Sequence, residues 1–277
     1  MSQEQIKLWQ IATSFGNLKL VHATYITQSF ARHSHDDFPI GVIERGALGF
    51  YYRGENVVAP VGSINLANPG ETHTGQAAVE TGWTYRMFYC DLALLRRAAA
   101  EITGKTADIP FFRPGVIQDV ELAELIRHLH LTLEQPNISK LEQESRILQM
   151  LVQLILRHAD HHPALRSFGA DHQAVKRAQE YLEAHYTQNI SLEQLAQIAY
   201  LSPFHLARMF HENLGLPPHA YLTQVRVRRA KELLARGCPI TEVAFETGFV
   251  DQSHLTKRFK RIVGITPDQY RKNVQDK

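Results

Sequence analysis

The sequence predicts an α+β protein of two domains, with an N-terminal β-barrel or jelly roll followed by helices and a C-terminal all-α domain. Three observations support this fold class. The chain has 277 residues, more than one typical domain. Short apolar runs broken by glycines fill residues 18–90, and a helical period begins after Asp91. The last hundred or so residues carry one helical pattern twice. The predicted divisions are 1–160, a linker over 161–171, and 172–277.

Six runs in the first part have the length and composition of strands. They are rich in β-branched and aromatic residues, and glycines and the Pro69-Gly70 pair separate them. The runs are 19–26, 38–44, 47–53, 56–60, 63–67 and 83–90. Many short strands with regular turns are typical of a barrel or jelly roll.

Three helices are expected between the strands and the linker, over 92–102, 120–135 and 141–159. The second and third place their leucines and isoleucines on one face, as amphipathic helices do. Such a pair could pack on the barrel or form a dimer surface. Residues 159–171 contain Pro163 and Gly169 and show no clear period, which indicates a linker.

Residues Ser191–Gly215 and Ile240–Gly264 are two copies of one pattern. Leu195 aligns with Val243 and Phe210 with Phe259. Each copy has a small residue, a turn, a capping residue and an inward aromatic residue, which together predict a helix-turn-helix unit. Ser191, Ser202, Thr241 and Asp251 are the expected caps. A helix over 220–235 joins the copies and would hold their second helices about one DNA turn, roughly 34 Å, apart.

The second helix of each copy should present side chains to DNA. Gln can bind adenine with two hydrogen bonds, and Arg or Lys can bind guanine, whereas contacts to phosphate carry no sequence information. The expected DNA-binding residues are Phe204, His205, Ala207 and Arg208 in the first copy and Gln252, Ser253, His254, Lys257 and Arg258 in the second, with Lys260 and Arg271 at phosphates. Because these two sets differ, one chain should bind an asymmetric site.

Composition favours a soluble cytoplasmic protein. The sequence has 44% hydrophobic and 21% charged residues, two cysteines, no long apolar run and no signal-peptide pattern, so we expect no membrane association. The net charge of +2 disfavours a passive nucleoid protein. From Asp171 onward, however, 15 basic residues stand against 11 acidic ones. These basic residues could neutralise phosphates or form a solvated helix face.

Residues Arg226–Lys272 resemble the AraC/XylS family of bacterial transcription regulators. The string from Ala244 to Phe249 matches the family pattern A-x-x-x-G-F. Further matching residues are Ser253, Leu255, Phe259, Lys260, Gly264, Pro267 and Tyr270. The resemblance implies two helix-turn-helix units that bind promoter DNA, and activation through RNA polymerase.

Residues 32–54 and 68–75 resemble the cupin-like sensor domain of many such regulators. The resemblance implies a small-molecule effector in the barrel and a homodimer formed through the following helices. The expected effector-binding residues are His33, His35, Glu71, His73 and Tyr85. The three histidines match metal-ligand positions of cupins, but Asp36 and Asp37 stand where a glutamate is expected. We therefore expect hydrogen bonding, with no metal or cofactor.

The alternative function is a metal-dependent cupin enzyme, such as an isomerase or dioxygenase, fused to a DNA-binding tail. No nucleophile paired with a base and no glycine-rich phosphate loop supports it. His158, His161 and His162 fall at a helix end and in the linker, where solvated histidines are expected. The sequence thus favours a regulator over an enzyme.

Overall fold

The computed structural model describes residues 4–103, 107–160 and 172–275, and the side chains of Asn273 and Gln275 are not described. These residues form two compact units. The first takes in the chain up to Gln135 and from Arg146 to residue 160. The second takes in Pro136–Ser145 and the chain from residue 172. The linker predicted over 161–171 lies outside the described residues. None of the described helices is long and apolar enough to cross a membrane.

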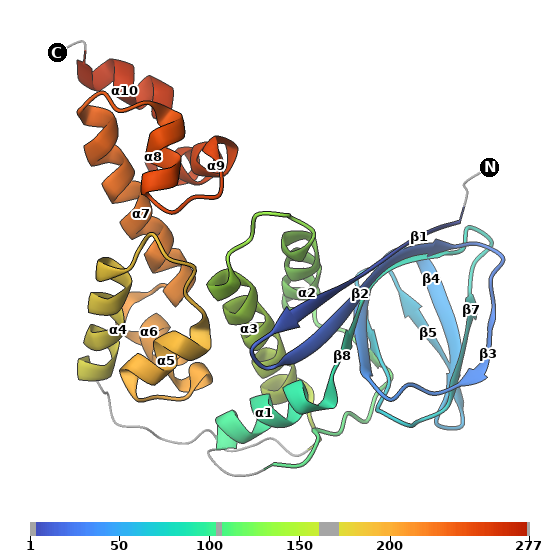
Figure 1. Ribbon diagram of the computed structural model, residues 1–277. Helices are drawn as coiled ribbons and strands as arrows, with labels where there is room; N and C mark the ends of the chain where they lie inside the picture. Colours follow the sequence, from blue (N-terminus) through green and yellow to red (C-terminus); the bar gives the residue numbers. More distant parts are fainter. Residues whose placement is uncertain (1–3, 104–106, 161–171, 276–277) are drawn as a thin grey trace. The chain divides into compact units, whose positions relative to one another are not determined.

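In its described residues the first unit is an antiparallel β-structure of nine strands, which curve into a barrel (Figure 1). Five neighbour pairs give the order β1-β2-β8-β4-β6-β9, and β4 also pairs with β5 and β7, while β3 pairs with β7. The strands are β1 (Gln5–Thr13), β2 (Gly16–Tyr25), β3 (Phe30–His33), β4 (Phe38–Tyr52), β5 (Glu55–Pro60), β6 (Ile64–Leu66), β7 (His73–Ala77), β8 (Trp83–Cys90) and β9 (Val116–Ile117).

Strand β4 belongs to both sides of the barrel because it bends at Gly46. Its first half pairs with β6 and β8, and its second half pairs with β5 and β7. The pairing with β8 shifts between Ile43 and Arg45, which marks a β-bulge. Gly46 has φ of +65°, and an added Cβ there would lie 1.8 Å from the carbonyl oxygen of Gly82. Only glycine fits this bend, so the closure of the barrel depends on it.

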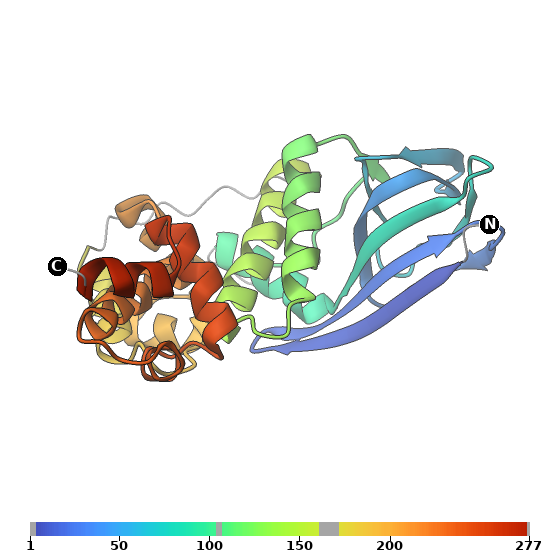
Figure 2. The same ribbon diagram turned by 90° about the horizontal axis from the view of Figure 1, so that it is seen from above.

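Three helices follow strand β8, with β9 between the first two: α1 (Leu92–Thr103), α2 (Val120–Leu133) and α3 (Lys140–His158). Helix α2 packs against β4 and β8. Helices α2 and α3 lie side by side, next to the barrel (Figure 2). Under α2, the buried Arg86 of β8 donates to Glu44 at 2.8 Å and forms an ion pair with Glu134. Polar as well as apolar contacts therefore attach α2 to the barrel.

The second unit is all-helical beyond residue 172 and contains both copies of the repeated pattern. Its helices are α4 (His172–Ala184), α5 (Leu192–Ala199), α6 (Pro203–Leu214), α7 (Pro218–Ala235), α8 (Ile240–Glu246), α9 (Gln252–Val263) and α10 (Pro267–Gln275). Helix α7 packs against α4, α6, α8, α9 and α10. It therefore serves as the common support of the helix pairs α5–α6 and α8–α9.

Most elements agree with the sequence predictions, and the differences have local causes. The runs 38–44 and 47–53 are one strand, because the bulge between Ile43 and Arg45 shifts the pairing with β8 instead of ending it. Strands β1, β3, β7 and β9 were not predicted. The prediction that Thr241 caps its helix is wrong: α8 begins two residues earlier than that cap implies, at Ile240 after Pro239, and has no side-chain cap. The caps Ser191, Ser202 and Asp251 are confirmed.

The bend in β4 makes a stability prediction. Gly46→Ala should lower the free energy of unfolding by about 3 kcal/mol or more, because the left-handed backbone and the contact with Gly82 are both unfavourable for alanine. Gly54→Ala is the matched control. Gly54 also has a positive φ, +92°, but no atom lies within 4 Å of an added Cβ, so we expect a loss of about 1 kcal/mol. Urea unfolding of both variants would measure this, and equal losses would contradict the account.

Candidate functional site

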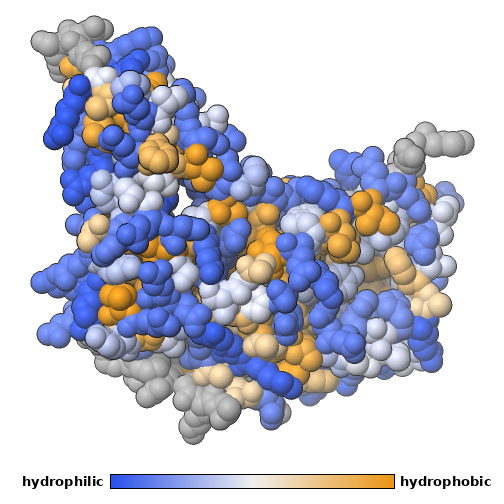
Figure 3. All heavy atoms as spheres, viewed as in Figure 1, coloured by the Kyte–Doolittle hydropathy of each residue, from blue (hydrophilic) through white to orange (hydrophobic). Residues whose placement is uncertain are grey.

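The barrel of the first unit holds a cavity of about 410 Å³, a size suited to a small molecule. In Figure 3 the barrel side is hollowed between its strands, with hydrophobic residues lining the hollow. Strands β2, β3, β4, β6, β7 and β8 all contribute side chains to its wall, and Ile6 and Leu8 of β1 join them while remaining exposed. Seven strands thus converge on one concave site.

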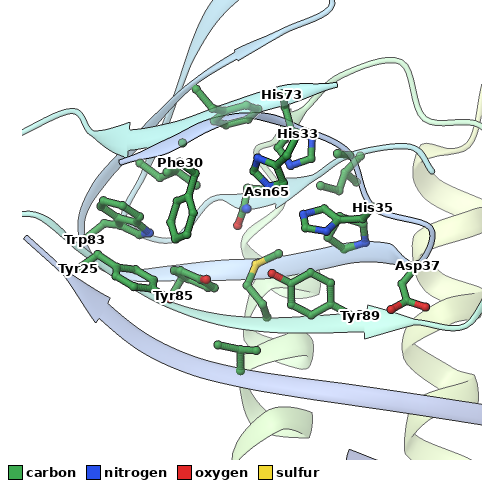
Figure 4. Close-up of a pocket in the computed structure, with 18 of the residues that line it drawn as sticks. Tyr25, Phe30, His33, His35, Asp37, Asn65, His73, Trp83, Tyr85 and Tyr89 are labelled. Carbon is green, nitrogen blue, oxygen red and sulfur yellow. The ribbon is translucent and has the colours of Figure 1, made fainter. Parts of the chain in front are cut away.

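One end of the cavity is aromatic. Along β8 every second residue faces inward, so Trp83, Tyr85 and Tyr89 line the cavity while Arg86 faces α2. The Tyr25 ring lies 5.1 Å from that of Trp83 and 5.9 Å from that of Tyr85, between ring centres. Figure 4 shows the Tyr25, Trp83 and Tyr85 rings gathered at one side, together with Phe30, whereas Tyr89 lies beside His35. Burial raises the pKa of the Tyr85 hydroxyl well above its usual range, so this wall is neutral and suits an apolar ligand body.

The other end of the cavity holds the three histidines that the sequence singled out. Ring centres lie 4.5 Å apart for His33 and His73, 4.8 Å for His33 and His35, and 5.1 Å for His35 and His73. Burial, followed by the neighbouring histidines, lowers the pKa of His35 to about 4, and burial also lowers the pKa of His73. His35 and His73 are therefore neutral imidazoles at pH 7 and do not supply positive charge for an anionic ligand.

Two buried polar atoms near the cavity lack a protein hydrogen-bond partner within the described part of the chain. They are Oδ1 of Asn65 and Nε1 of Trp83, and both residues line the cavity. Asn65 is 8% exposed and Trp83 is 1% exposed. A buried polar group without a partner is costly, so such groups mark places where a ligand or water supplies the missing bond. The sequence alone does not single out Asn65.

Glu71 is the exception among the residues predicted to bind the effector, because it does not line the cavity. Its carboxylate accepts hydrogen bonds from the Tyr52 hydroxyl and from Asn68 Nδ2, the latter at 3.1 Å, and pairs with Arg53 at 3.4 Å. These bonds turn the side chain away from the cavity. Its backbone carbonyl, however, accepts from Nδ1 of His73 at 3.1 Å. Glu71 therefore supports the site through another residue.

Helix α6 occupies the place of the first predicted recognition helix. Leu206 and Phe210 are fully buried, as predicted. Phe204 and His205, which the sequence predicts to bind DNA, are also buried, with 8% and 6% exposure. His205 lies one turn before the buried Met209 on a helix packed against α4, α5 and α7.

Few of the predicted DNA-binding residues of α6 reach the surface. Ala207 and Arg208 are partly exposed, and Arg208 Nε donates to Glu212 Oε1 at 2.8 Å, one turn later on the same helix. This ion pair is at the surface, where such pairs contribute little stability. Arg208 therefore remains available for a stronger partner.

Helix α9 presents a wider polar face. Gln252, Ser253, Lys257 and Lys260 are exposed, whereas Leu255 and Phe259 are fully buried. Of the other predicted DNA-binding residues, His254 packs edge-on against Phe249, with ring centres 5.3 Å apart.

Two further predicted cations, besides Arg208, already have acidic partners within the second unit. Arg258 donates to Glu142 at 2.6 Å and Arg271 to Asp268 at 3.1 Å. Glu142 is almost fully buried, so its bond to Arg258 is the more demanding of the two to replace.

Comparison with known proteins decides the family. Residues 15–151 match the AraC-like ligand binding domain, and residues 195–273 match a helix-turn-helix domain. An HTH-type transcriptional regulator of Bacillus subtilis is 35% identical over 230 residues, which cover 83% of this chain and 82% of that protein. The chain belongs to the AraC family of transcription regulators. The lactose operon transcription activator of Staphylococcus xylosus is 24% identical over 83% of this regulator and 82% of its own length.

Solved structures are similar to part of the regulator. The C-terminal domain of AraT, a response regulator from Geobacillus stearothermophilus, is 35% identical and covers 36% of this chain and 84% of its own, with a TM-score of 0.35. The DNA-binding domain of AdpA in complex with a target DNA is 28% identical and covers 37% of this chain and 94% of its own, with a TM-score of 0.36.

Arg226 has a structural role in the regulator that its basic neighbours hide in the sequence. It is 7% exposed, and its guanidinium donates to the backbone carbonyls of Tyr186 at 2.7 Å and Gln188 at 2.9 Å. Burial lowers its pKa to about 10, so it stays charged at pH 7. Arg226 thereby ties α7 to the turn after α4 and is not available to phosphate.

This assignment predicts that two arginine substitutions on α7 differ in their effect on stability. Arg226→Ala should destabilise the helical unit by about 2–4 kcal/mol, because the two backbone carbonyls that hold α7 to the turn after α4 lose the charged donor of a buried side chain. Arg228→Ala, on the same helix with its side chain 54% exposed, should change stability by about 0.5 kcal/mol or less. Thermal unfolding followed by circular dichroism measures both. An Arg226→Ala protein of unchanged stability would show that the role assigned to Arg226 is wrong.

Proposed function

We propose that this regulator binds an asymmetric promoter site through both α6 and α9, under the control of a small molecule in the barrel cavity. The observation that carries the proposal is the divergence of the two copies at their exposed positions. Their buried positions keep the same character, as at Leu195 and Val243 or Phe210 and Phe259, all fully buried. The exposed positions hold Arg208 in α6 but Gln252 and its neighbours in α9. A shared scaffold with different surface residues suits two different stretches of bases.

The chemistry of these residues assigns the contacts. Arg208 would bind guanine and Gln252 adenine, each with two hydrogen bonds, while Ser253 and Lys257 extend the face of α9. Lys260 and Arg271 would bind phosphates and set the position of the helices on the duplex. Arg208 must exchange its exposed bond to Glu212 for a base, and that exchange costs little because surface ion pairs are weak.

We also infer that the regulator acts in the cytoplasm as a homodimer that activates transcription with RNA polymerase. The activator name of the relative from Staphylococcus xylosus supports activation. The amphipathic helices α2 and α3, which lie beside the barrel, supply the surface for a partner copy (Figure 2). The effector would place an apolar body against the Tyr25, Trp83 and Tyr85 rings and polar atoms near the histidines.

Base contacts and phosphate contacts should respond differently to substitution. Arg208→Ala and Gln252→Ala should each lose about 1–3 kcal/mol of binding free energy on the best promoter fragment and relax the preference at one base position. Lys260→Ala should weaken binding to all sequences alike, because phosphates are the same in each. Fluorescence anisotropy at one fixed salt concentration measures the binding free energy of each variant for the best fragment and for a scrambled fragment. If Arg208→Ala weakened both fragments equally, its assignment to a base would be wrong.

The cavity makes a separate prediction. Compounds that bind it should raise the thermal unfolding midpoint of the barrel by mass action. Asn65→Leu should keep the fold, because it removes a buried amide oxygen that lacks a partner, and should reduce the shift caused by such compounds. Asn56→Leu, an exposed amide of β5 outside the cavity, is the control. Thermal unfolding against a metabolite panel tests this, and equal shifts in all three proteins would place binding elsewhere.

A further inference from the structure

The three cavity histidines come from two paired strands and the segment after one of them. His33 ends β3 and His73 begins β7, and the two residues are direct partners in the antiparallel pairing. Their side chains therefore lie on the same face of the sheet. His35, two residues after His33, closes the group from the third side (Figure 4). The backbone pairing thus brings the rings together independently of any ligand.

One potential ligand nitrogen from each of the three rings lies within 4.8 Å of the others. An ion bonded to three imidazoles at about 2.1 Å holds those nitrogens about 3–3.5 Å apart. Small side-chain rotations close that difference, because the rings are only partly buried and border an open cavity. The group therefore has nearly the size that a metal ion requires.

Two of the rings are oriented by their own backbone. Nδ1 of His33 donates to the carbonyl of Ala31 at 2.8 Å, and Nδ1 of His73 donates to the carbonyl of Glu71 at 3.1 Å. A carbonyl can only accept, so Nδ1 carries the proton and the neutral ring keeps its lone pair on Nε2. Metal-binding histidines are held in the same way, with the second nitrogen bonded to a carbonyl or carboxylate. Two of the three Nε2 atoms are thus prepared to bind a cation.

Hydrogen bonding within the protein does not account for the group. Among the described residues no protein donor bonds to Nε2 of His33, His35 or His73. The nearby carboxylate of Asp37 accepts from Lys19 Nζ at 2.7 Å. The Nε2 lone pairs of His33 and His73 are left without a protein donor in the described part of the chain, and a metal ion could bond to them and to one nitrogen of His35.

We propose that His33, His35 and His73 bind one first-row divalent transition-metal ion, such as Zn²⁺, whose remaining coordination positions face the cavity. This goes beyond the proposed regulation of DNA binding and differs from the hydrogen-bonding role that the sequence predicts for these residues. A protein set of three nitrogens leaves at least one position to water or to an oxygen donor of the effector. The ion would add positive charge beside the neutral imidazoles of His35 and His73.

The test is a zinc titration of the full chain after treatment with a chelator and desalting. Isothermal titration calorimetry should give one Zn²⁺ per chain. His35→Ala and His73→Ala should each weaken binding at least tenfold, because each removes one of three ligands. His128→Ala, an exposed histidine of α2 with its side chain 66% exposed, is the matched control and should bind like the parent.

A second measurement separates the site from surface binding and from misfolding. Co²⁺ in place of Zn²⁺ should give visible d–d absorption in the parent and in His128→Ala but not in His35→Ala. Circular dichroism of each variant shows whether it is folded. If an alanine variant is unfolded, His33→Asn takes its place as the variant that lacks one ligand. A stoichiometry well below one Zn²⁺ per chain would overturn the proposal. So would an equal affinity for Zn²⁺ in the parent and in the folded variants of the three histidines. Neither result bears on the DNA-binding assays, so the two proposals fail separately.

Discussion

The packing of α7 against five other helices is the constraint on which the DNA-binding half depends. Its apolar residues, including Val227, Ala230 and Leu234, form one core with α8 and α9, and Leu222 and Val225 are buried on the same helix. Arg226 adds a polar tie to the backbone after α4. Because both recognition helices rest on one rigid element, their separation is set by packing rather than by the flexibility of a loop.

The barrel depends on a comparable constraint at one residue. Glycine at position 46 lets β4 change partners and so belong to both sides of the structure. The continuity of β4 places the aromatic wall and the histidines around one cavity. Both halves of the regulator therefore use one long element, β4 or α7, to position residues that lie far apart in the sequence.

The sequence was sufficient wherever a local period carries the information. The apolar run 83–90 predicts a strand, and the repeat predicts both helix pairs, with three of the four predicted caps confirmed. The sequence was not sufficient where a side chain contacts residues that are distant in the chain. His205 and Arg226 look like surface residues, but His205 is buried on a helix that packs against three others, and two backbone carbonyls some forty residues earlier hold Arg226.

In the cavity, too, local spacing is visible in the sequence and distant contacts are not. The spacing of His33 and His35 suggests a shared face, but only the pairing of His33 with His73 brings the third ring to it. Glu71 illustrates the converse, since its neighbours Tyr52 and Asn68 turn it away from the cavity that its position in the sequence suggests. Asn65 gives no signal in the sequence, because its importance rests on an oxygen that lacks a partner in the folded protein.

The central claim is that one chain binds two different stretches of bases with two recognition helices on one support. Selection of bound DNA from a random pool by the full chain, followed by sequencing, tests it most directly. The account predicts two unlike blocks of preferred bases in fixed order, about one helical turn or 10 base pairs apart. A single block, or two blocks whose spacing varies freely, would contradict it.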